Sequence, residues 1–364
     1  MKIAIVINTS WNIYNFRLGL IKKLQSEGHE VYAIAPKDEY SEKLVAEGCI
    51  FVPIAIDNKG SNPIKDFLLM IKYLRIFFSI KPHYILQYTI KPNIYGTLAA
   101  KCLGIPTINN VSGLGTVFLH DNLVSKIAKW LYRFAFRFPK RIFFQNNDDL
   151  ELFVAHHLVA KQKADVLPGS GVNLQKYEPK PFRRNDTFVF ILIARLLYDK
   201  GLVEYVDAIK ILKNEHVDAK FQILGFTDFE SHLGISENLL NDWISNGYVE
   251  YLGHTSDVIP FINQADCVVL PSYREGTPKT LIEALSLAKP IVTTNVPGCK
   301  ETVVDGVNGL LCEVKNAQDL ADKMYLMLKK ENIDLDRMGQ NGRKLAEMKF
   351  DEQIVIKKYL DIIN

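Results

Sequence analysis

Cysteine is scarce in this sequence, and its few cysteines are scattered. An odd number of thiols without a Cys-x-x-Cys pair is typical of reduced cysteines in a cytosolic protein, because disulfide frameworks and zinc sites need pairs. The five are Cys49, Cys102, Cys267, Cys299 and Cys312. The eight histidines show no metal-ligand spacing either, and the adjacent His156 and His157 cannot share one helix face. We therefore expect no metal site.

Long hydrophobic runs are also missing. No uninterrupted apolar stretch approaches the ~18–20 residues that a membrane-spanning helix needs. The N-terminal segment MKIAIVINTSWN has a short apolar run but no small-residue cleavage site, which predicts a strand and not a signal peptide. These features predict a cytoplasmic protein, although one that could still bind a membrane surface.

The common nucleotide-binding and nucleophile motifs are absent as well. After the first apolar run the sequence reads Asn8-Thr9-Ser10-Trp11-Asn12, without the Gly-x-Gly-x-x-Gly turn that lets a backbone approach a pyrophosphate. The nearest approximation, residues 113–118, lacks its third glycine. Neither a Gly-x4-Gly-Lys-Ser/Thr loop nor a Gly-x-Ser-x-Gly elbow occurs. A dinucleotide oxidoreductase and a P-loop nucleotidase are therefore disfavoured.

The composition is that of a folded protein, but its charge is uneven. Apolar residues make up 48% and charged residues 23% of the 364 residues, enough apolar material for two domains. Residues 1–170 carry 21 basic and 13 acidic residues, a net charge of +8, whereas residues 171–364 carry 23 and 28, a net charge of −5. The asymmetry indicates that the first half meets something anionic, such as a nucleic acid, a lipid surface or a phosphorylated substrate.

Short β-branched runs alternate with longer amphipathic segments, which predicts parallel sheets covered by helices. In the first half we expect strands at 2–8, 31–35, 50–54, 83–87, 106–111, 141–145 and 164–167, and helices at 16–27, 40–47, 64–79, 93–103 and 123–138. In the second half we expect strands at 187–194, 219–224, 248–252, 267–270, 291–294 and 309–312, and helices at 201–213, 237–245, 279–288, 317–330, 334–347 and 351–362. The Gly-, Pro- and charge-rich residues 167–186 separate the halves.

This pattern predicts two Rossmann-like α/β domains facing a central cleft. The first domain would span residues 1–170 and the second residues 187–347. Residues 171–186 would form a linker, and a C-terminal helix at about 348–364 would pack back on the first domain.

The segment PSYREGTPKTLIEALSLAKPIV, residues 271–292, is the most informative of the chain. Thr277 followed by Pro278 predicts a helix N-cap and a proline at the first helical position. The free N–H groups of Lys279 and Thr280 would then form an anion site. Glu275 precedes the helix and Glu283 lies eight residues further on. That spacing alone is weak evidence, and by itself two solvated glutamates explain it as well.

The surrounding sequence is more specific. Ser-Tyr-Arg-Glu-Gly-Thr-Pro-x-x-Leu-x-Glu-Ala, followed by Lys-Pro-Ile-Val and Pro-Gly-Cys-Lys-Glu, closely resembles the donor-binding core of glycosyltransferase family 4. Residues 193–201, 249–254 and 305–309 also fit the family, and the resemblance extends over nearly the whole chain. It implies the GT-B fold and a retaining transferase, and it looks closest to bacterial enzymes that build lipid-linked surface glycans.

The resemblance also implies roles for individual residues. Arg195 and Lys200 would hold the leaving diphosphate of a nucleotide sugar, Glu283 would accept the ribose hydroxyls, and Glu275 would contact the donor sugar or the charge that develops at its anomeric carbon. We expect Glu275, Arg195 and Lys200 to be catalytic. The donor-binding residues would be Arg195, Lys200, Gly225, Glu275, Gly276, Thr277, Pro278, Lys279, Thr280 and Glu283. No metal, cofactor or protein base is expected, because in this family the leaving phosphate is thought to help deprotonate the acceptor.

The first domain should bind the acceptor. Arg17 and Lys91 could each hold an acceptor phosphate, although solvent-facing charges are an equal alternative. Ser112 and Gly113 follow a predicted strand, in a loop whose small residues would permit close approach of a sugar.

Residues 126–141 combine basic and aromatic side chains. Residues 122–147 hold six basic and no acidic residues, interleaved with Trp130, Tyr132, Phe134, Phe136 and Phe138. This fits an interfacial membrane contact. Two alternatives are a core helix with a solvated basic face and, disfavoured by the donor site, RNA binding.

We therefore expect a retaining hexosyl or N-acetylhexosaminyl transferase. It would move a sugar from a nucleotide diphosphate, for which we expect a UDP-sugar such as a UDP-N-acetylhexosamine, to a polyprenyl-diphosphate-linked saccharide. Its partners would be these two substrates and an anionic membrane surface at the inner face of the bacterial cytoplasmic membrane, with no nucleic acid. The rival functions are a non-catalytic sugar-nucleotide-binding assembly protein and a GT-B-like nucleotide-sugar epimerase.

Overall fold

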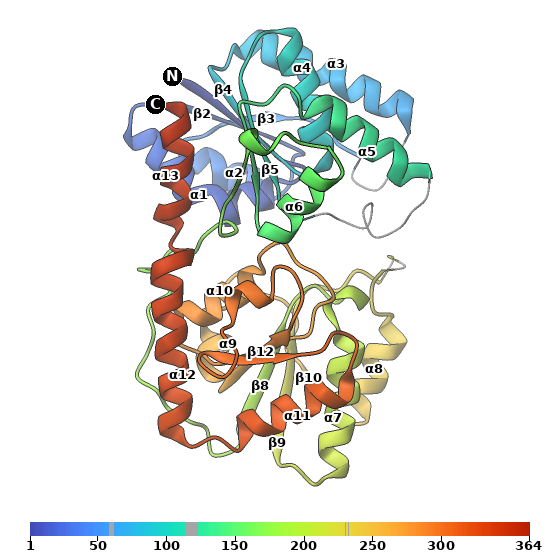
Figure 1. Cartoon of the computed structure of the whole chain (residues 1–364), viewed down its shortest axis with the longest axis vertical. Coiled ribbons are helices and arrows are strands. Elements are labelled where there is room, and N and C mark those ends of the chain that lie inside the picture. Colours follow the sequence, from blue (N-terminus) through green and yellow to red (C-terminus); the bar gives the residue numbers. More distant parts are fainter. Residues whose placement is uncertain (58–61, 114–122, 230, 232) are drawn as a thin grey trace. The chain divides into compact units, whose positions relative to one another are not determined.

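A computed structural model describes residues 1–57, 62–113, 123–229, 231 and 233–364. Its contacts divide the chain into two compact units, of which the first is Met1–Ser170 with Glu352–Asn364 and the second Gly171–Asp351. Each unit has one parallel sheet covered by helices on both faces (Figure 1). None of the helices among the described residues combines the length and apolar character needed to cross a bilayer.

The sheet of the first unit has seven strands in the order β3-β2-β1-β4-β5-β6-β7, all parallel. The strands are β1 (Lys2–Val6), β2 (Glu30–Ala35), β3 (Ile50–Pro53), β4 (Tyr84–Tyr88), β5 (Thr107–Val111), β6 (Arg141–Phe144) and β7 (Ala164–Val166). Successive side chains of a β-strand point to opposite faces of the sheet, so alternate residues of β1 pack against different helices. Ile3 and Ile5 are buried with α1 (Ser10–Ser26) and α13 (Glu352–Ile363), and Ala4 and Val6 with α3 (Pro63–Ile80).

The remaining helical segments of this unit are short. They are α2 (Tyr40–Ala46), the π-helix η1 (Pro92–Gly96), α4 (Thr97–Cys102), α5 (Leu123–Ala135), α6 (Asn147–Ala155) and the 3₁₀ turn η3 (Lys161–Lys163). The last helix of the chain, α13, packs against α1, so both ends of the chain contribute to this unit (Figure 1).

The second unit has a six-stranded parallel sheet in the order β10-β9-β8-β11-β12-β13. The strands are β8 (Phe188–Ile193), β9 (Ala219–Leu224), β10 (Glu250–Tyr251), β11 (Cys267–Leu270), β12 (Ile291–Thr294) and β13 (Gly309–Cys312). The helices are α7 (Leu202–Asn214), α8 (Glu237–Ser245), α9 (Ile259–Gln264), α10 (Lys279–Ser286), α11 (Ala317–Leu328) and α12 (Asn332–Leu345). The 3₁₀ turns η4 (Tyr198–Lys200) and η5 (Lys300–Thr302) and the π-helix η6 (Ala346–Phe350) complete it. One face of the sheet packs on α7, α8 and α11 and the other on α9 and α10.

The structure differs from the expectations in three details. Helix α1 begins at Ser10 and not at residue 16, because the Thr9 hydroxyl caps it by accepting a hydrogen bond from the backbone N–H of Asn12. Helices α6 and α9 were not expected. Residues 171–186, expected as a linker, are grouped with the second unit, and Val172 and Tyr177 are buried in its core.

Candidate functional site

The strongest candidate site of the second unit lies where β8 and β11 end. The loop after β8 contains Arg195 and the η4 turn, which ends at Lys200. Gly201 follows with φ +74°, and a Cβ atom there would lie 2.1 Å from the carbonyl oxygen of Pro271. Only glycine therefore lets this loop pack so closely on the loop after β11. The backbone N–H of Tyr273 also donates to the carbonyl of Asp199 at 2.9 Å.

This packing brings two of the expected catalytic residues together. The Lys200 Nζ atom lies 2.7 Å from the Glu275 Oε1 atom, and both side chains are mostly buried. The Ser272 hydroxyl donates to the same carboxylate oxygen at 2.8 Å. The third expected catalytic residue, Arg195, is solvent-exposed at the end of β8. Sequence reasoning missed Ser272, since a serine beside a glutamate has no distinctive signal.

Gly225 supports the same region through its backbone. A Cβ atom at this position would lie 1.7 Å from the carbonyl oxygen of Ala194, the residue before Arg195. Its N–H donates to the Gly253 carbonyl at 2.8 Å, and its own carbonyl accepts from the Tyr251 hydroxyl at 2.9 Å. The glycine therefore allows the ends of β8 and β9 to approach each other.

Helix α10 begins at Lys279, where the range expected from the sequence begins, but its N-cap differs from the expected one. Pro278 occupies the N-cap position, without a side-chain cap, and Lys279 is the first helical residue. The prediction of Thr277 as N-cap is therefore wrong, because the backbone of Pro278 is still extended, with ψ 119°. The side chain of Lys279 donates to the carbonyl of Gly171 at 2.9 Å, and the Thr280 hydroxyl donates to the carbonyl of Ile193 at 3.0 Å. These bonds fix the start of α10 against β8, with Gly276 buried just before it.

Glu283 is buried, with 6% of its surface exposed. The Tyr177 hydroxyl donates to its Oε1 atom at 2.6 Å. Burial raises the pKa of Glu283 above its ordinary value, while the charge of Lys279 and the bond from Tyr177 oppose the rise. Tyr177 comes from the segment expected to be a linker, 106 residues away in the chain, and no sequence signal pairs the two. A carboxylate held this way can still accept hydrogen bonds from a ligand.

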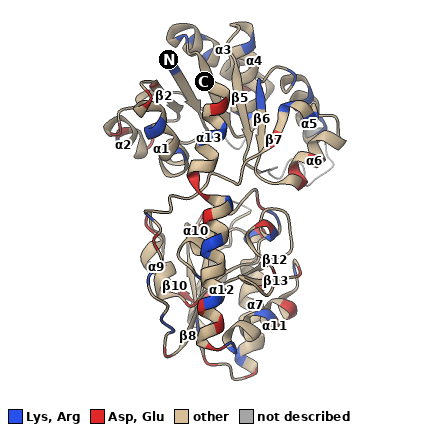
Figure 2. Cartoon of the chain, turned by 60° about the vertical axis from the view of Figure 1, so that its left-hand side comes forward, with Lys and Arg blue, Asp and Glu red and all other residues tan. Residues whose placement is uncertain are grey.

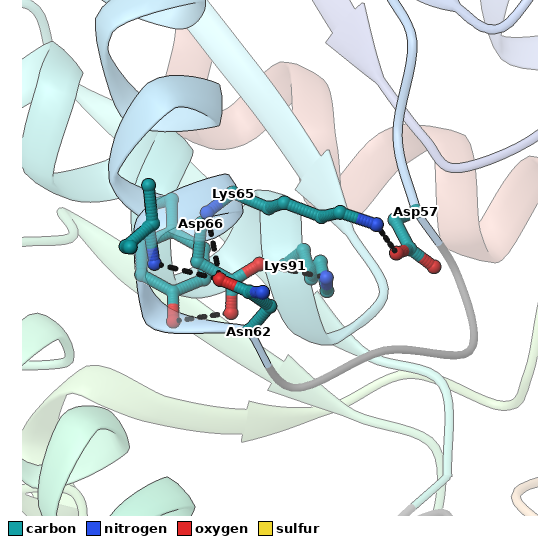
Figure 3. Close-up of polar contacts among 7 residues, drawn as sticks. Asp57, Asn62, Lys65, Asp66 and Lys91 are labelled. Carbon is teal, nitrogen blue, oxygen red and sulfur yellow. Dashed lines mark hydrogen bonds and ion pairs between the residues drawn. The ribbon is translucent and has the colours of Figure 1, made fainter.

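Lys91, one of the acceptor residues expected in the first unit, has an acidic partner within that unit. Lys91 forms an ion pair with Asp66 of α3, with 2.7 Å between Nζ and Oδ1, and Asp66 also accepts a hydrogen bond from the Tyr95 hydroxyl. Figure 3 shows Lys91 turned toward Asp66, near Asn62 and the Lys65–Asp57 pair. Lys91 is therefore not a solvent-facing charge, because its charge is matched by Asp66 inside the unit. Its role as a ligand of an acceptor phosphate stays a prediction.

The other expected acceptor residues are Arg17, Ser112 and Gly113, for which the structure gives contacts other than an ion pair. Arg17 is buried, with 4% of its surface exposed, and lies over the ring of Tyr88. The Ser112 hydroxyl donates to Asn110 Oδ1 at 3.1 Å, and Gly113 follows with φ 127°. The rest of the expected sugar-contacting loop, residues 114–115, lies outside the described residues.

The structure divides the basic-aromatic residues 126–141 between core and surface. Tyr132 and Phe136 are buried in the first unit, whereas Trp130 is 64% and Phe134 41% exposed. The two exposed rings stack, with 6.1 Å between their centroids. Lys126, Arg133 and Arg137 of the same segment are also exposed. Figure 2 marks the basic positions of the chain in blue, those of α5 among them. The helix is therefore not simply a core helix.

No group of three or more His, Cys, Asp and Glu side chains that could hold a metal ion occurs within the described part of the chain. The absence of a metal requirement stays a prediction.

Comparison with known proteins decides the family. Residues 175–345 match the family model "Glycosyl transferases group 1", and residues 2–146 match "Glycosyl transferase 4-like". A Campylobacter jejuni relative, N,N'-diacetylbacillosaminyl-diphospho-undecaprenol alpha-1,3-N-acetylgalactosaminyltransferase, is 30% identical over 100% of this chain and 98% of its own. The chain belongs to this glycosyltransferase family.

A further relative and a solved structure are similar to this glycosyltransferase over most of its length. An Escherichia coli UDP-Gal:alpha-D-GlcNAc-diphosphoundecaprenol alpha-1,3-galactosyltransferase is 27% identical over 80% of this chain and 77% of its own. Among solved structures, Anabaena HepE in complex with UDP and glucose superimposes with a TM-score of 0.83 at 17% identity, covering 99% of this chain and 98% of that one. The fold is therefore GT-B, as the sequence resemblance implied.

Proposed function

We propose that this glycosyltransferase transfers a sugar, with retention of its α-configuration, from a UDP-sugar to a saccharide linked to polyprenyl diphosphate. The observation that carries the proposal is the convergence of Lys200, Glu275 and the start of α10 where β8 and β11 end. Ligands of open α/β sheets bind at the carboxyl ends of the strands.

The donor would be held by its diphosphate and its ribose. Arg195 and Lys200 supply fixed positive charge, and the first N–H groups of α10, at Lys279 and Thr280, can donate to phosphate oxygens. Glu283 would accept from the ribose hydroxyls. Since Tyr177 already donates to one carboxylate oxygen, that contact also holds the carboxylate in place for the ribose.

In the reaction, the bond between the anomeric carbon and the diphosphate oxygen breaks, and a bond to the acceptor hydroxyl oxygen forms. The electron pair of the broken bond stays on the diphosphate, where Lys200 and Arg195 stabilise it. The acceptor proton passes to the leaving phosphate. Glu275 lies beside Lys200 and can contact the donor sugar or the positive charge that grows on its anomeric carbon.

The relatives indicate the substrate classes. The Campylobacter relative is named for transfer of N-acetylgalactosamine to a diphospho-undecaprenol-linked sugar, and the Escherichia coli relative for transfer from UDP-galactose to an equivalent acceptor. A UDP-N-acetylhexosamine donor is therefore the first to test.

We also propose that the first unit binds the anionic inner face of the bacterial cytoplasmic membrane, where such an acceptor resides. Helix α5 presents the stacked Trp130 and Phe134 among basic residues. Helix α3 packs, like α5, against η1 and exposes further large apolar side chains. These are Ile64, Phe67, Leu68 and Phe78. The acidic residue of α3, Asp66, is buried and paired, so its exposed charges are all basic. Apolar side chains ringed by cations match an anionic lipid surface.

A screen of the purified protein against nucleotide sugars, read by release of the nucleotide in the presence of a lipid-diphosphate-linked saccharide, tests the activity. We expect release from one UDP-sugar, dependent on the acceptor and lost in Arg195→Ala. Nucleotide-sugar binding without turnover would support the assembly protein, and interconversion of sugars without an acceptor would support the epimerase.

A further inference from the structure

The Arg17 guanidinium is a buried cation for which the described residues supply no counter-ion. Its side chain, on the second turn of α1, is 4% exposed. Its Nε atom is fully buried without a hydrogen-bond partner, and the ring of Tyr88, 4.2 Å from the guanidinium carbon, is the contact that we find for it in the described chain. A buried charge without a paired anion is unfavourable unless it serves a ligand.

Three partly buried cations among the described residues have partners within the chain. Lys91 is paired with Asp66. Lys289 donates to two backbone carbonyls at 2.7 and 2.9 Å. Arg343 donates to three carbonyl oxygens and forms an ion pair with a glutamate. Arg17 is more deeply buried than these three and has no hydrogen bond or ion pair of this kind among the described residues.

The phenols of Tyr88 and Tyr359 lie beside Arg17 and are neutral. The ring of Tyr88 lies 6.4 Å from that of Tyr359 on α13, and the Tyr359 hydroxyl accepts a hydrogen bond from the Asn110 amide at 3.2 Å. Burial raises the pKa of both phenols, Tyr88 and Tyr359, so neither ionises at neutral pH. Neither phenol therefore supplies a counter-charge to Arg17, and no ion pair compensates its charge within the described residues.

This cluster lies at the edge of the sheet where ligands bind. Tyr88 is the last residue of β4, and Asn110 is next to last in the adjacent strand β5. Asn110 in turn accepts a hydrogen bond from the exposed Ser112. The network thus links the buried guanidinium to the surface residues expected to contact the acceptor sugar.

We propose that Arg17 binds the diphosphate of the acceptor, with Tyr88, Tyr359 and Asn110 holding the guanidinium in position. The inference rests on the proposed function and assigns the acceptor's anionic group to a side chain of the first unit. Arginine suits this task because its planar fork can donate two parallel hydrogen bonds to a phosphate.

The test compares two short, water-soluble acceptors that carry the same saccharide, one as a polyprenyl diphosphate and the other as a neutral alkyl glycoside. In Arg17→Gln we expect kcat/KM for the diphosphate acceptor to fall by about 10- to 100-fold. The kcat/KM for the neutral glycoside and the KM for the donor should stay unchanged. In Arg17→Lys the kcat/KM for the diphosphate acceptor should fall less, because lysine keeps the positive charge but lacks the two parallel N–H donors of the guanidinium. Arg183→Gln, which removes an exposed arginine of the second unit, is the matched control and should behave as wild type.

Inorganic diphosphate provides a second measurement. It should compete with the diphosphate acceptor in the wild type at saturating donor, and about tenfold less well in Arg17→Gln. Equal losses on both acceptors together with a lower Tm would show that Arg17 is structural, and a rise in donor KM alone would assign it to the donor. Either result overturns the inference. If the wild type turns over neither acceptor, the proposed function fails instead.

Discussion

Replacing Glu283 by glutamine should weaken donor binding without weakening the fold. The amide oxygen can still accept the hydrogen bond from Tyr177, so the local packing is kept. The variant loses the charge that would bind the ribose hydroxyls. A hydrogen bond to a charged group is worth ~1.5–3 kcal/mol and a neutral one ~0.5–1.5. The difference, about 1–1.5 kcal/mol, corresponds to roughly a tenfold loss of UDP affinity.

The same substitution makes a separate prediction about stability. Since burial raises the pKa of Glu283 in the folded state, the contribution of this carboxyl to stability is complete below its unfolded pKa and is lost as the pH rises through the raised folded value. Glutamine does not titrate, so at neutral pH the Tm of Glu283→Gln should equal or exceed that of the wild type.

Calorimetry with UDP and thermal unfolding, both at neutral pH, measure the two effects. Glu237→Gln, which makes the same change on the exposed first turn of α8, is the control and should alter neither. As the pH is lowered, the UDP affinity of the wild type should fall relative to that of Glu283→Gln. Protonation of the Glu283 carboxylate removes the charged hydrogen-bond acceptor, whereas glutamine does not titrate. Unchanged UDP affinity in Glu283→Gln would refute the assignment.

Three further predictions follow from the site and the surface. Arg195→Ala and Lys200→Ala should each lower kcat by ~10²–10³, and near-normal kcat in both would exclude them from leaving-group stabilisation. Activity should persist in EDTA, whereas strict dependence on added metal would contradict the mechanism. Changing Lys129, Arg133 and Arg137 together to Glu should release the protein from anionic vesicles, since each basic residue contributes ~1 kcal/mol there, and high salt should do the same. The triple variant should keep its activity on a soluble acceptor, and vesicle binding equal to wild type would remove α5 from the membrane contact.

The sequence predicted the fold closely because buried parallel strands are short β-branched runs between turn residues. The strand of residues 267–270, for example, is β11 with the same bounds. Helices α6 and α9 were missed because nine and six residues are too few for a clear helical period. The start of α1 was missed because a cap at Thr9, and not hydrophobic periodicity, sets it. The family and the GT-B fold are confirmed.

The candidate site was less accessible to sequence reasoning because its contacts join distant residues. Motifs located Lys200 and Glu275, but their ion pair spans 75 residues. The pairing of Tyr177 with Glu283 and that of Lys91 with Asp66 had no local signal. The roles of the donor and acceptor residues, and the cleft between the domains, stay predictions.

The most direct test of the central claim is the anomeric configuration of the product, determined by NMR after reaction of a UDP-N-acetylhexosamine with a short-chain polyprenyl-diphosphate-linked saccharide. We expect a new glycosidic bond in the α-configuration of the donor, formed with stoichiometric release of UDP. A β-linked product would contradict retention, and the absence of any transfer from every nucleotide sugar tried would contradict the proposed activity itself.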